Sequence, residues 1–226
     1  MPNTYLDWNA TAPLSAAARM AWLAAQDEAW GNPASVHDQG QRARHVIDQA
    51  KAICARLLGC KTHELIVTSG GTEANALAIH AAAESAGMNA GTPPLIISSV
   101  IDHSSVLRNA ELYGRLVKLP VDQHGRLDPQ SVQDAMQDQP ALVCLQFANN
   151  ELGTRQDVTA LVAAVRAMAP QTRVLLDCAQ GAGKAVIDLR ALEVDFASIA
   201  GHKFGAPKGV GLLYAKSGVR FPLLIA

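Results

Sequence analysis

One lysine in this chain stands where its amine could act as a nucleophile. Lys203 follows His202, after the apolar run 195–199 and before a loop rich in glycine and proline. An amine at the end of a buried strand loses part of its hydration, which lowers its pKa and lets it attack an aldehyde. Pyridoxal phosphate is the common biological aldehyde that is held in this way, as a Schiff base. A strand, a turn and a surface lysine would give the same short pattern.

A second segment has the chemistry of a phosphate cradle. Residues 64–75 read as a short apolar strand, a Ser-Gly-Gly turn and the start of a helix. Gly70 and Gly71 let the backbone approach an anion closely, and the first turn of the helix presents free N–H groups. The Thr72 hydroxyl adds a donor. An ordinary strand-to-helix turn has a similar sequence.

Two more side chains follow apolar strands. Asp177 closes the strand 173–177, where its carboxylate could hold a pyridinium N–H and keep the ring an electron sink. His103 follows the strand 95–97 and could lie against a flat aromatic cofactor and move protons. Ligands of open α/β sheets bind outside the carboxyl ends of the strands, which favours both readings. The alternatives are a turn or N-cap aspartate and a histidine that merely neighbours a helix start.

Seven short segments, spread over the whole chain, carry a family resemblance. They are 5–13, 31–37, 68–73, 102–103, 149–153, 177–180 and 201–203. In this order they resemble the fold-type I enzymes of pyridoxal phosphate, and more narrowly the class V aminotransferase group with its cysteine desulfurases. Each segment alone is a weak signal, whereas seven in register form a specific one.

The resemblance implies a role for each candidate residue around the cofactor ring. Lys203 would bind the aldehyde carbon, and Asp177 would pair with the pyridine nitrogen. His103 would stack on the ring and share the catalytic proton transfers with Lys203. Gln180 would hydrogen-bond the phenolic oxygen, and Asn150 would lie beside the ring and the substrate carboxylate.

The resemblance also implies a phosphate site, with two departures from the usual pattern. Gly71, Thr72 and His202 would hold the phosphate. The family often has serine or threonine where this chain has Ala200, so one phosphate hydroxyl would be missing. It often has a second threonine where this chain has Ala12, near the substrate mouth.

The function implied by the resemblance is a pyridoxal phosphate-dependent cysteine desulfurase. It would convert L-cysteine to L-alanine plus an enzyme-bound persulfide, whose sulfur feeds iron–sulfur cluster or thio-cofactor assembly. The expected setting is a cytoplasmic homodimer that meets an iron–sulfur scaffold or another sulfur-acceptor protein. The alternatives are another class V enzyme, such as a selenocysteine lyase or an aminotransferase, and a non-catalytic remnant that acts only in dimerisation or docking.

Relatives of this kind continue well past Ala226. They carry a glycine-rich segment for the partner's phosphate site, a loop with the sulfur-accepting cysteine, and an arginine for the substrate carboxylate. The uncharged ending 221–226 also looks like an element cut through, because natural termini are usually polar. We therefore read the sequence as the N-terminal portion of a longer enzyme, and we expect the fragment alone to be inactive.

The composition excludes several classes of function. The chain has 226 residues and a formal net charge of −1, which argues against nucleic acid or an anionic membrane as partner. No apolar run approaches the ~20 residues of a membrane span, and the first residues lack the pattern of a secretory signal. The seven histidines and four cysteines show no metal-ligand spacing, so no metal site is expected. Cys178 adjoins Asp177, whose charge would raise its pKa, so it is not proposed as the sulfur acceptor.

The elements that must position these residues alternate along the chain. Strands are expected at 64–69, 95–99, 116–119, 141–147, 173–177, 195–200 and 211–215, and helices at 15–30, 38–58, 72–86, 104–113, after 128–129 and at 157–168. This order predicts an α/β fold, a three-layer α/β/α sandwich with a mostly parallel sheet. In the terms of the resemblance it is the large domain of a pyridoxal phosphate-dependent transferase without its C-terminal part. Residues 41–226 would form this incomplete domain, and residues 1–40 an N-terminal segment of a small subdomain.

Overall fold

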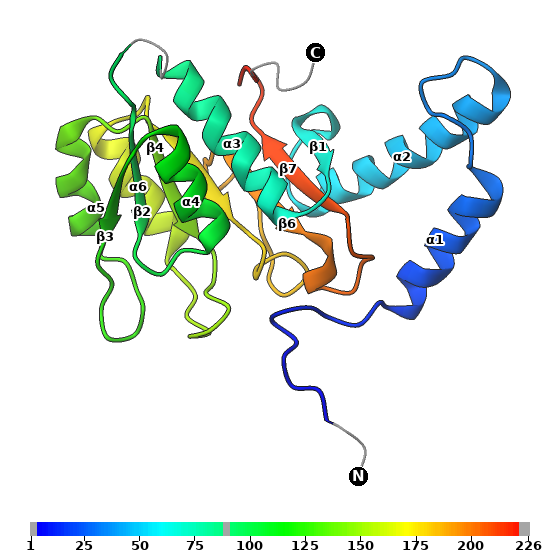
Figure 1. Ribbon diagram of the computed structural model, residues 1–226, viewed down its shortest axis with the longest axis horizontal. Helices are drawn as coiled ribbons and strands as arrows, with labels where there is room; N and C mark the ends of the chain where they lie inside the picture. Colours follow the sequence, from blue (N-terminus) through cyan, green and yellow to red (C-terminus); the bar gives the residue numbers. More distant parts are fainter. Residues whose placement is uncertain (1–3, 88–90, 222–226) are drawn as a thin grey trace.

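Seven strands form one sheet at the centre of the computed structural model, which describes residues 4–87 and 91–221 (Figure 1). In chain order they are β1 (Leu65–Thr68), β2 (Leu95–Ser99), β3 (Arg115–Leu119), β4 (Leu142–Gln146), β5 (Arg173–Asp177), β6 (Phe196–Ala200) and β7 (Gly211–Ala215). The order across the sheet is β1-β7-β6-β5-β4-β2-β3. Strand β7 runs antiparallel to both of its neighbours, and the remaining pairs are parallel.

Helices cover both faces of this sheet. The helices are α1 (Ala16–Glu28), α2 (Asp38–Leu57), α3 (Gly71–Ser85), α4 (Ser104–Tyr113), α5 (Pro129–Ala135) and α6 (Val158–Met168), with short 3-10 turns η1 (Thr62–Glu64), η2 (Met136–Asp138) and η3 (Gly201–Lys203). Helices α3 and α4 pack on one face, and α5 and α6 pack on the other. The predicted three-layer α/β/α fold with a mostly parallel sheet is therefore confirmed.

The central strands lack polar alternation because both of their faces are buried. Every residue of β2, β4 and β6 is buried. Successive residues point to opposite layers, so Leu175 packs with α3 and α4 whereas Leu176 packs with α5 and α6. Burying one such leucine contributes roughly 1.5–3 kcal/mol, which makes the central strands the main source of stability. The strands β1 and β3 form the edges and are partly exposed.

Helix starts follow the capping residues that the sequence offers. The Ser15 hydroxyl accepts from Ala18 N at the start of α1, and the Asp157 carboxylate accepts from Ala160 N at the start of α6. Asp128 caps α5, with Pro129 in its first turn. Gly59, with φ of +66°, follows the end of α2, where a left-handed residue ends a helix at low cost. These ends agree with the predicted helices to within two residues.

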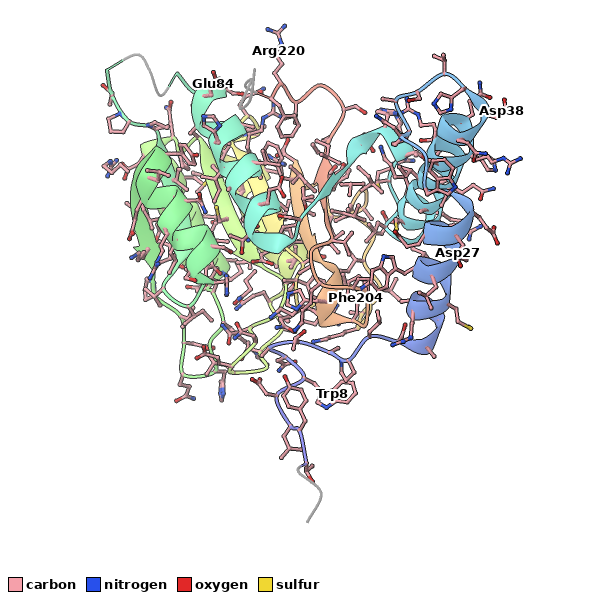
Figure 2. All side chains as sticks on the ribbon, turned by 45° about the vertical axis from the view of Figure 1, so that its right-hand side comes forward. Trp8, Asp27, Asp38, Glu84, Phe204 and Arg220 are labelled. Atoms are coloured by element: carbon pink, nitrogen blue, oxygen red, sulfur yellow. The ribbon has the colours of Figure 1, made fainter. Side chains whose placement is uncertain are left out.

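The first two helices project from the layered part of the chain (Figure 1, blue). Figure 2 shows Asp27 on α1 and Asp38 on α2 well away from the sheet, and Trp8 on the N-terminal segment below the sheet in this view. Helix α1 buries none of its side chains, and α2 buries Gly40, Ala43 and Ala55. The small subdomain predicted for residues 1–40 stays a prediction.

The sequence predicts that an element is cut through at the apolar ending 221–226. Residues 222–226 lie outside the described residues, so this prediction is described at Phe221 alone. The Phe221 ring contacts the Phe196 ring edge to face, with centroids 6.3 Å apart. Among the described helices, none has the length and apolar character needed to cross a bilayer.

Candidate functional site

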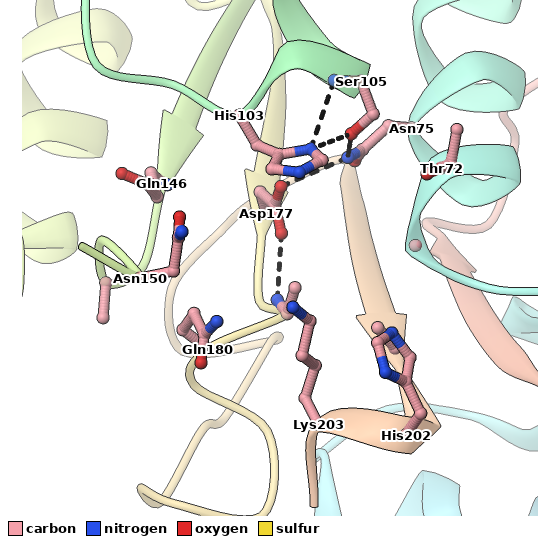
Figure 3. Close-up of a pocket in the computed structure, with 14 residues that line it drawn as sticks. Thr72, Asn75, His103, Ser105, Gln146, Asn150, Asp177, Gln180, His202 and Lys203 are labelled. Carbon is pink, nitrogen blue, oxygen red and sulfur yellow. Dashed lines mark hydrogen bonds between the residues drawn. The ribbon is translucent and has the colours of Figure 1, made fainter. Parts of the chain in front are cut away.

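A cavity of about 220 Å³ lies at the carboxyl ends of the parallel strands. The ends of β4, β5 and β6 contribute Gln146, Asp177 and Ala200 to its wall, and the first turns of α3 and α4 contribute the facing wall (Figure 3). All eight predicted site residues line this one cavity: Gly71, Thr72, His103, Asn150, Asp177, Gln180, His202 and Lys203. The parallel topology explains their meeting, because it brings the carboxyl ends of neighbouring strands to one edge.

Asp177 is a buried carboxylate whose oxygens are well supplied with donors. It is 6% exposed, and its Oδ1 accepts from Ala179 N at 2.9 Å and from Ser198 Oγ at 3.3 Å. Its Oδ2 accepts from Asn75 Nδ2 at 3.2 Å. The bond to Ala179 N is the local turn that the sequence also suggested. That turn fixes the direction of the carboxylate, so the structural and the functional reading of Asp177 agree.

His103 is the N-cap residue of α4, as its second sequence reading suggested. Its Nδ1 lies 3.2 Å from Ser105 N and 2.8 Å from Ser105 Oγ. These two contacts set the plane of the imidazole against the start of the helix. The cap therefore holds in place a ring that also lines the cavity.

The first turn of α3 faces the cavity without a side-chain cap at Gly70. The first N–H groups of any helix have no acceptor inside it, so those of Gly71 and Thr72 are available to an anion. A Cβ on Gly211 would lie 2.7 Å from Gly70 Cα, which shows how closely β7 approaches this turn. Ala200 lines the same region and offers no hydroxyl. The geometry is that of an anion cradle with one donor fewer than the family pattern.

The His202 imidazole lies beside this cradle. Burial lowers its pKa, and the positive charges of Lys203 and Lys208 lower it further. Its Nδ1 lies 3.1 Å from Thr11 Oγ1. The N-terminal segment therefore orients this ring through Thr11.

Lys203 ends η3 and directs its amine at the N-terminal segment. Its Nζ donates to Asn9 O at 2.8 Å and to Ala10 O at 3.0 Å. Burial lowers the pKa of Lys203, and the nearby charge of Lys184 lowers it further, against an opposing effect of Asp177. The predicted direction of this shift is confirmed. A lowered pKa increases the fraction of unprotonated amine at neutral pH, which is the form that attacks a carbonyl.

Gln180 and Asn150 meet the same N-terminal segment. Gln180 Nε2 donates to Asn9 O at 2.8 Å, and Gln180 Oε1 accepts from Lys184 Nζ at 2.6 Å. Asn9 Nδ2 donates to Asn150 O at 3.0 Å, and Asn9 Oδ1 accepts from Lys184 Nζ at 3.1 Å. Asn9 thus contacts four residues, which come from three parts of the chain. Sequence reasoning gave Asn9 no role, although it lies in the first segment of the family resemblance.

The four cysteines are poor nucleophiles in this fold. Burial raises the pKa of the Cys178 thiol well above its usual range, and the charge of Asp177 raises it further. Burial does the same for Cys144. Burial also raises the pKa of Cys54, and that of Cys60 to about 11. Over the ranges 4–87 and 91–221, no group of three His, Cys, Asp or Glu side chains could hold a metal ion.

Comparison with solved structures identifies the class to which this fold and site belong. The fold matches a "NIFS-LIKE PROTEIN" with a TM-score of 0.93 at 31% identity, over 98% of this chain and 61% of that one. It matches "SspA in complex with cysteine" with a TM-score of 0.92 at 28% identity, over 99% of this chain and 65% of that one. The large domain of a NifS-like, pyridoxal phosphate-type transferase is therefore the architecture seen here.

Sequence comparison then gives the family. A profile of the family described as "Aminotransferase class-V" matches residues 4–224, so the chain belongs to that family. The chain is 35% identical to the "Cysteine desulfurase IscS" of Methanosarcina thermophila, over 97% of this chain and 54% of the relative. It is 31% identical to the "Selenocysteine lyase" of Rattus norvegicus, over 94% of this chain and 55% of the relative. The chain thus spans about half the length of the curated relatives it matches.

Proposed function

We propose that this chain is the cofactor-binding part of a pyridoxal phosphate-dependent cysteine desulfurase. The observation that carries the proposal is the convergence of all eight candidate side chains on one cavity at the carboxyl edge of the sheet. Membership of the class V family supports it, as does the likeness to proteins named cysteine desulfurase. The reaction would convert L-cysteine to L-alanine and leave the sulfur as an enzyme-bound persulfide.

The residues fit pyridoxal phosphate at both ends of the molecule. The buried Asp177 carboxylate suits a cationic ring nitrogen, and the uncapped first turn of α3 suits a phosphate dianion. Lys203, with its lowered pKa, suits the aldehyde. When bound, the cofactor supplies a carbonyl that captures the substrate amine and a ring that takes up electrons.

Five side chains around the cofactor ring have different tasks in the reaction. Asp177 holds the ring N–H in a dry environment, where a charged hydrogen bond is strong. Lys203 accepts and returns protons at Nζ, and His103 does so at Nε2, because its Nδ1 faces Ser105. Asn150 and Gln180 orient the substrate carboxylate and the phenolic oxygen. Asn150, Gln180 and Lys203 each form a hydrogen bond with Asn9, so the N-terminal segment fixes their positions relative to one another.

A cysteine thiolate that accepts the sulfur is not provided by Cys54, Cys60, Cys144 or Cys178, because burial raises the pKa of each. The relatives are about twice as long as the stretch that this chain matches. We propose that their additional part is where the acceptor loop, the substrate arginine and the partner-facing phosphate segment lie. The whole enzyme would act as a cytoplasmic homodimer and pass its sulfur to an iron–sulfur scaffold or another acceptor protein.

Selenocysteine lyase is the second candidate, because one relative carries that name at 31% identity. Its substrate differs from cysteine only in the chalcogen, so the cavity described above serves both. The preference between the two substrates must therefore be measured in the full-length protein, as the ratio of kcat/KM for selenocysteine to kcat/KM for cysteine.

The decisive experiment is cofactor binding followed by product analysis. The 226-residue chain is titrated with pyridoxal phosphate, and visible absorbance reports binding. Wild type should bind, and Lys203→Ala should lose the covalently held fraction, whereas Lys208→Ala should retain it. The full-length enzyme with cysteine should then release alanine. Absence of binding by the wild type, or unchanged binding by Lys203→Ala, would contradict the proposal.

A further inference from the structure

Asn75 is a buried amide on α3 with no role in the function proposed above. It is 1% exposed, and it lines the same cavity as Asp177 and His103. Within the described parts of the chain, its Oδ1 has no hydrogen-bond partner, whereas its Nδ2 has two. The hydrogen bonds donated by Nδ2 therefore determine how this buried amide is oriented.

Both N–H bonds of the Asn75 amide are committed to acceptors in the site. One points at Asp177 Oδ2, 3.2 Å away, and the other at Ser105 Oγ, 3.0 Å away. An ionised carboxylate can only accept, so a flipped amide would place two acceptor oxygens against each other. The charge on Asp177 therefore fixes which end of Asn75 faces it.

The amide orientation determines where the Ser105 proton goes. Ser105 Oγ accepts from Asn75, so its own hydrogen is free to point to His103 Nδ1, 2.8 Å away. Ser105 N–H also points at that nitrogen, from 3.2 Å. Two donors converge on Nδ1, and a ring nitrogen that accepts carries no proton. Figure 3 shows these bonds as one series from Asp177 through Asn75 and Ser105 to His103.

We propose that Asn75 is a positioning residue that joins Asp177 and His103 into one hydrogen-bonded unit, and that this unit places the proton of the neutral His103 ring on Nε2. The proposal rests on the proposed function only for the identity of the ring that these two side chains hold. Asp177, which would recognise the pyridine nitrogen, and His103, which would stack on the ring, are then positioned by one shared hydrogen-bonded unit in addition to their separate local turns.

Two variants separate the two halves of this unit. Asn75→Leu removes the donors to both Asp177 and Ser105 and keeps the number and branching of the side-chain heavy atoms. Ser105→Ala removes the hydroxyl that links Asn75 to His103, but it leaves the main-chain N–H at position 105 and the bond from Asn75 to Asp177 in place. Asn109→Leu is the matched control, because within the described residues Asn109 Nδ2 donates only to the main-chain oxygen of Ser105, at 2.7 Å.

The first measurement does not involve the cofactor. Long-range proton–nitrogen spectra of the histidine-labelled chain, at a pH where imidazoles are neutral, report which ring nitrogen carries the proton. His103 is assigned by the signal lost in His103→Gln. Wild type and Asn109→Leu should show a protonated Nε2 and an unprotonated Nδ1. Both Ser105→Ala and Asn75→Leu should add a population protonated at Nδ1.

The second measurement is the Kd for pyridoxal phosphate, read from visible absorbance. Asn75→Leu should weaken binding by about tenfold, because one hydrogen bond to a charged group is lost. Ser105→Ala and Asn109→Leu should stay within about threefold of wild type, since Asp177 keeps its donor. Circular dichroism checks that each variant is folded, and Asn75→Ser replaces Asn75→Leu if the leucine variant is not.

The outcomes of the two measurements are distinguishable. A wild-type His103 protonated at Nδ1, or a ring that neither variant alters, would overturn the proposal. So would an Asn75 variant with the cofactor affinity of wild type. If the wild type binds no pyridoxal phosphate at all, the proposed function fails, and the ring spectra alone decide the present proposal.

Discussion

Asp102 allows a measurement of how much the free energy of unfolding falls when a buried carboxyl group next to the site becomes charged. Its carboxyl group is buried, with Oδ2 accepting from Ser98 Oγ and from Ser99 N, the latter at 3.0 Å. Burial raises the pKa of Asp102 from 3.8 to about 6, the charge of Asp177 raises it further, and the hydrogen bonds from Ser98 and Ser99 limit the rise. The folded chain therefore binds a proton more tightly at this position than the unfolded chain does.

The sign of the effect on stability follows from this difference. A raised carboxyl pKa favours the folded state at low pH, and that contribution is lost as the pH rises from 3.8 through about 6. The full difference corresponds to about 3 kcal/mol, of which roughly 1 kcal/mol has been lost at pH 4.5 and nearly all at pH 7.5. Asp102→Asn removes the titration but keeps an acceptor for Ser99 N. The variant should therefore gain about 2 kcal/mol relative to wild type between these two pH values.

Urea unfolding at pH 4.5 and at pH 7.5 measures this quantity. Circular dichroism and tryptophan fluorescence should give coincident transitions, which justifies a two-state free energy. Asp138→Asn is the control, because it removes a carboxylate from an exposed position in η2, and it should change the free energy of unfolding by less than about 0.5 kcal/mol. If wild type and Asp102→Asn change in parallel between the two pH values, the reasoning about burial at Asp102 is wrong.

Three further outcomes are expected. Borohydride reduction of the chain loaded with pyridoxal phosphate, followed by peptide mapping, should place the pyridoxyl label on Lys203, and a label on Lys184 or Lys208 would contradict the assignment. Asp195→Asn should lower the free energy of unfolding by about 2 kcal/mol or more, because this buried carboxylate pairs with Arg166 at 2.7 Å and Arg173 at 2.8 Å. Asp48→Asn, which removes only the exposed pair with Arg44, should change the same urea-unfolding free energy by less than about 0.5 kcal/mol, and equal effects of the two variants would be inconsistent with burial as the cause. The 226-residue chain supplied with cysteine, cofactor and a thiol reductant should form no alanine beyond the rate of free cofactor, and sustained turnover that Lys203→Ala abolishes would disprove this.

The layered fold could be predicted from the sequence because its signals are local. Unbroken apolar runs such as 174–176 are typical of strands that are buried on both faces. Ser15, Asp128 and Asp157 mark helix starts through bonds to N–H groups two or three residues further along the chain. The strand order is a different matter. Nothing near β1 indicates that its one neighbour is β7, because that pairing is made by residues far apart in the sequence.

The candidate site likewise contains residues that carry a local sequence signal and residues that carry none. Lys203, Asp177 and His103 could be found because each follows an apolar strand, and parallel strands bring such positions together. Asn75 could not be found, since an asparagine inside a helix carries no local signal of the carboxylate it will face. Asn9 was missed for a related reason: its contacts reach Asn150, Gln180, Lys184 and Lys203, all more than a hundred residues away.

The pairing of β1 with β7 has a consequence for synthesis on the ribosome. The turn at Gly70 emerges early, yet the strand that supports it, with Gly211 packed against Gly70, emerges about 140 residues later. Among the described strands, β7 is the one that lies beside β1, so β1 lacks its hydrogen-bonded neighbour until then. The turn that we propose for the phosphate is thus translated early but gains its neighbouring strand late, and a nascent chain halted before residue 211 would lack the packing of Gly211 against Gly70.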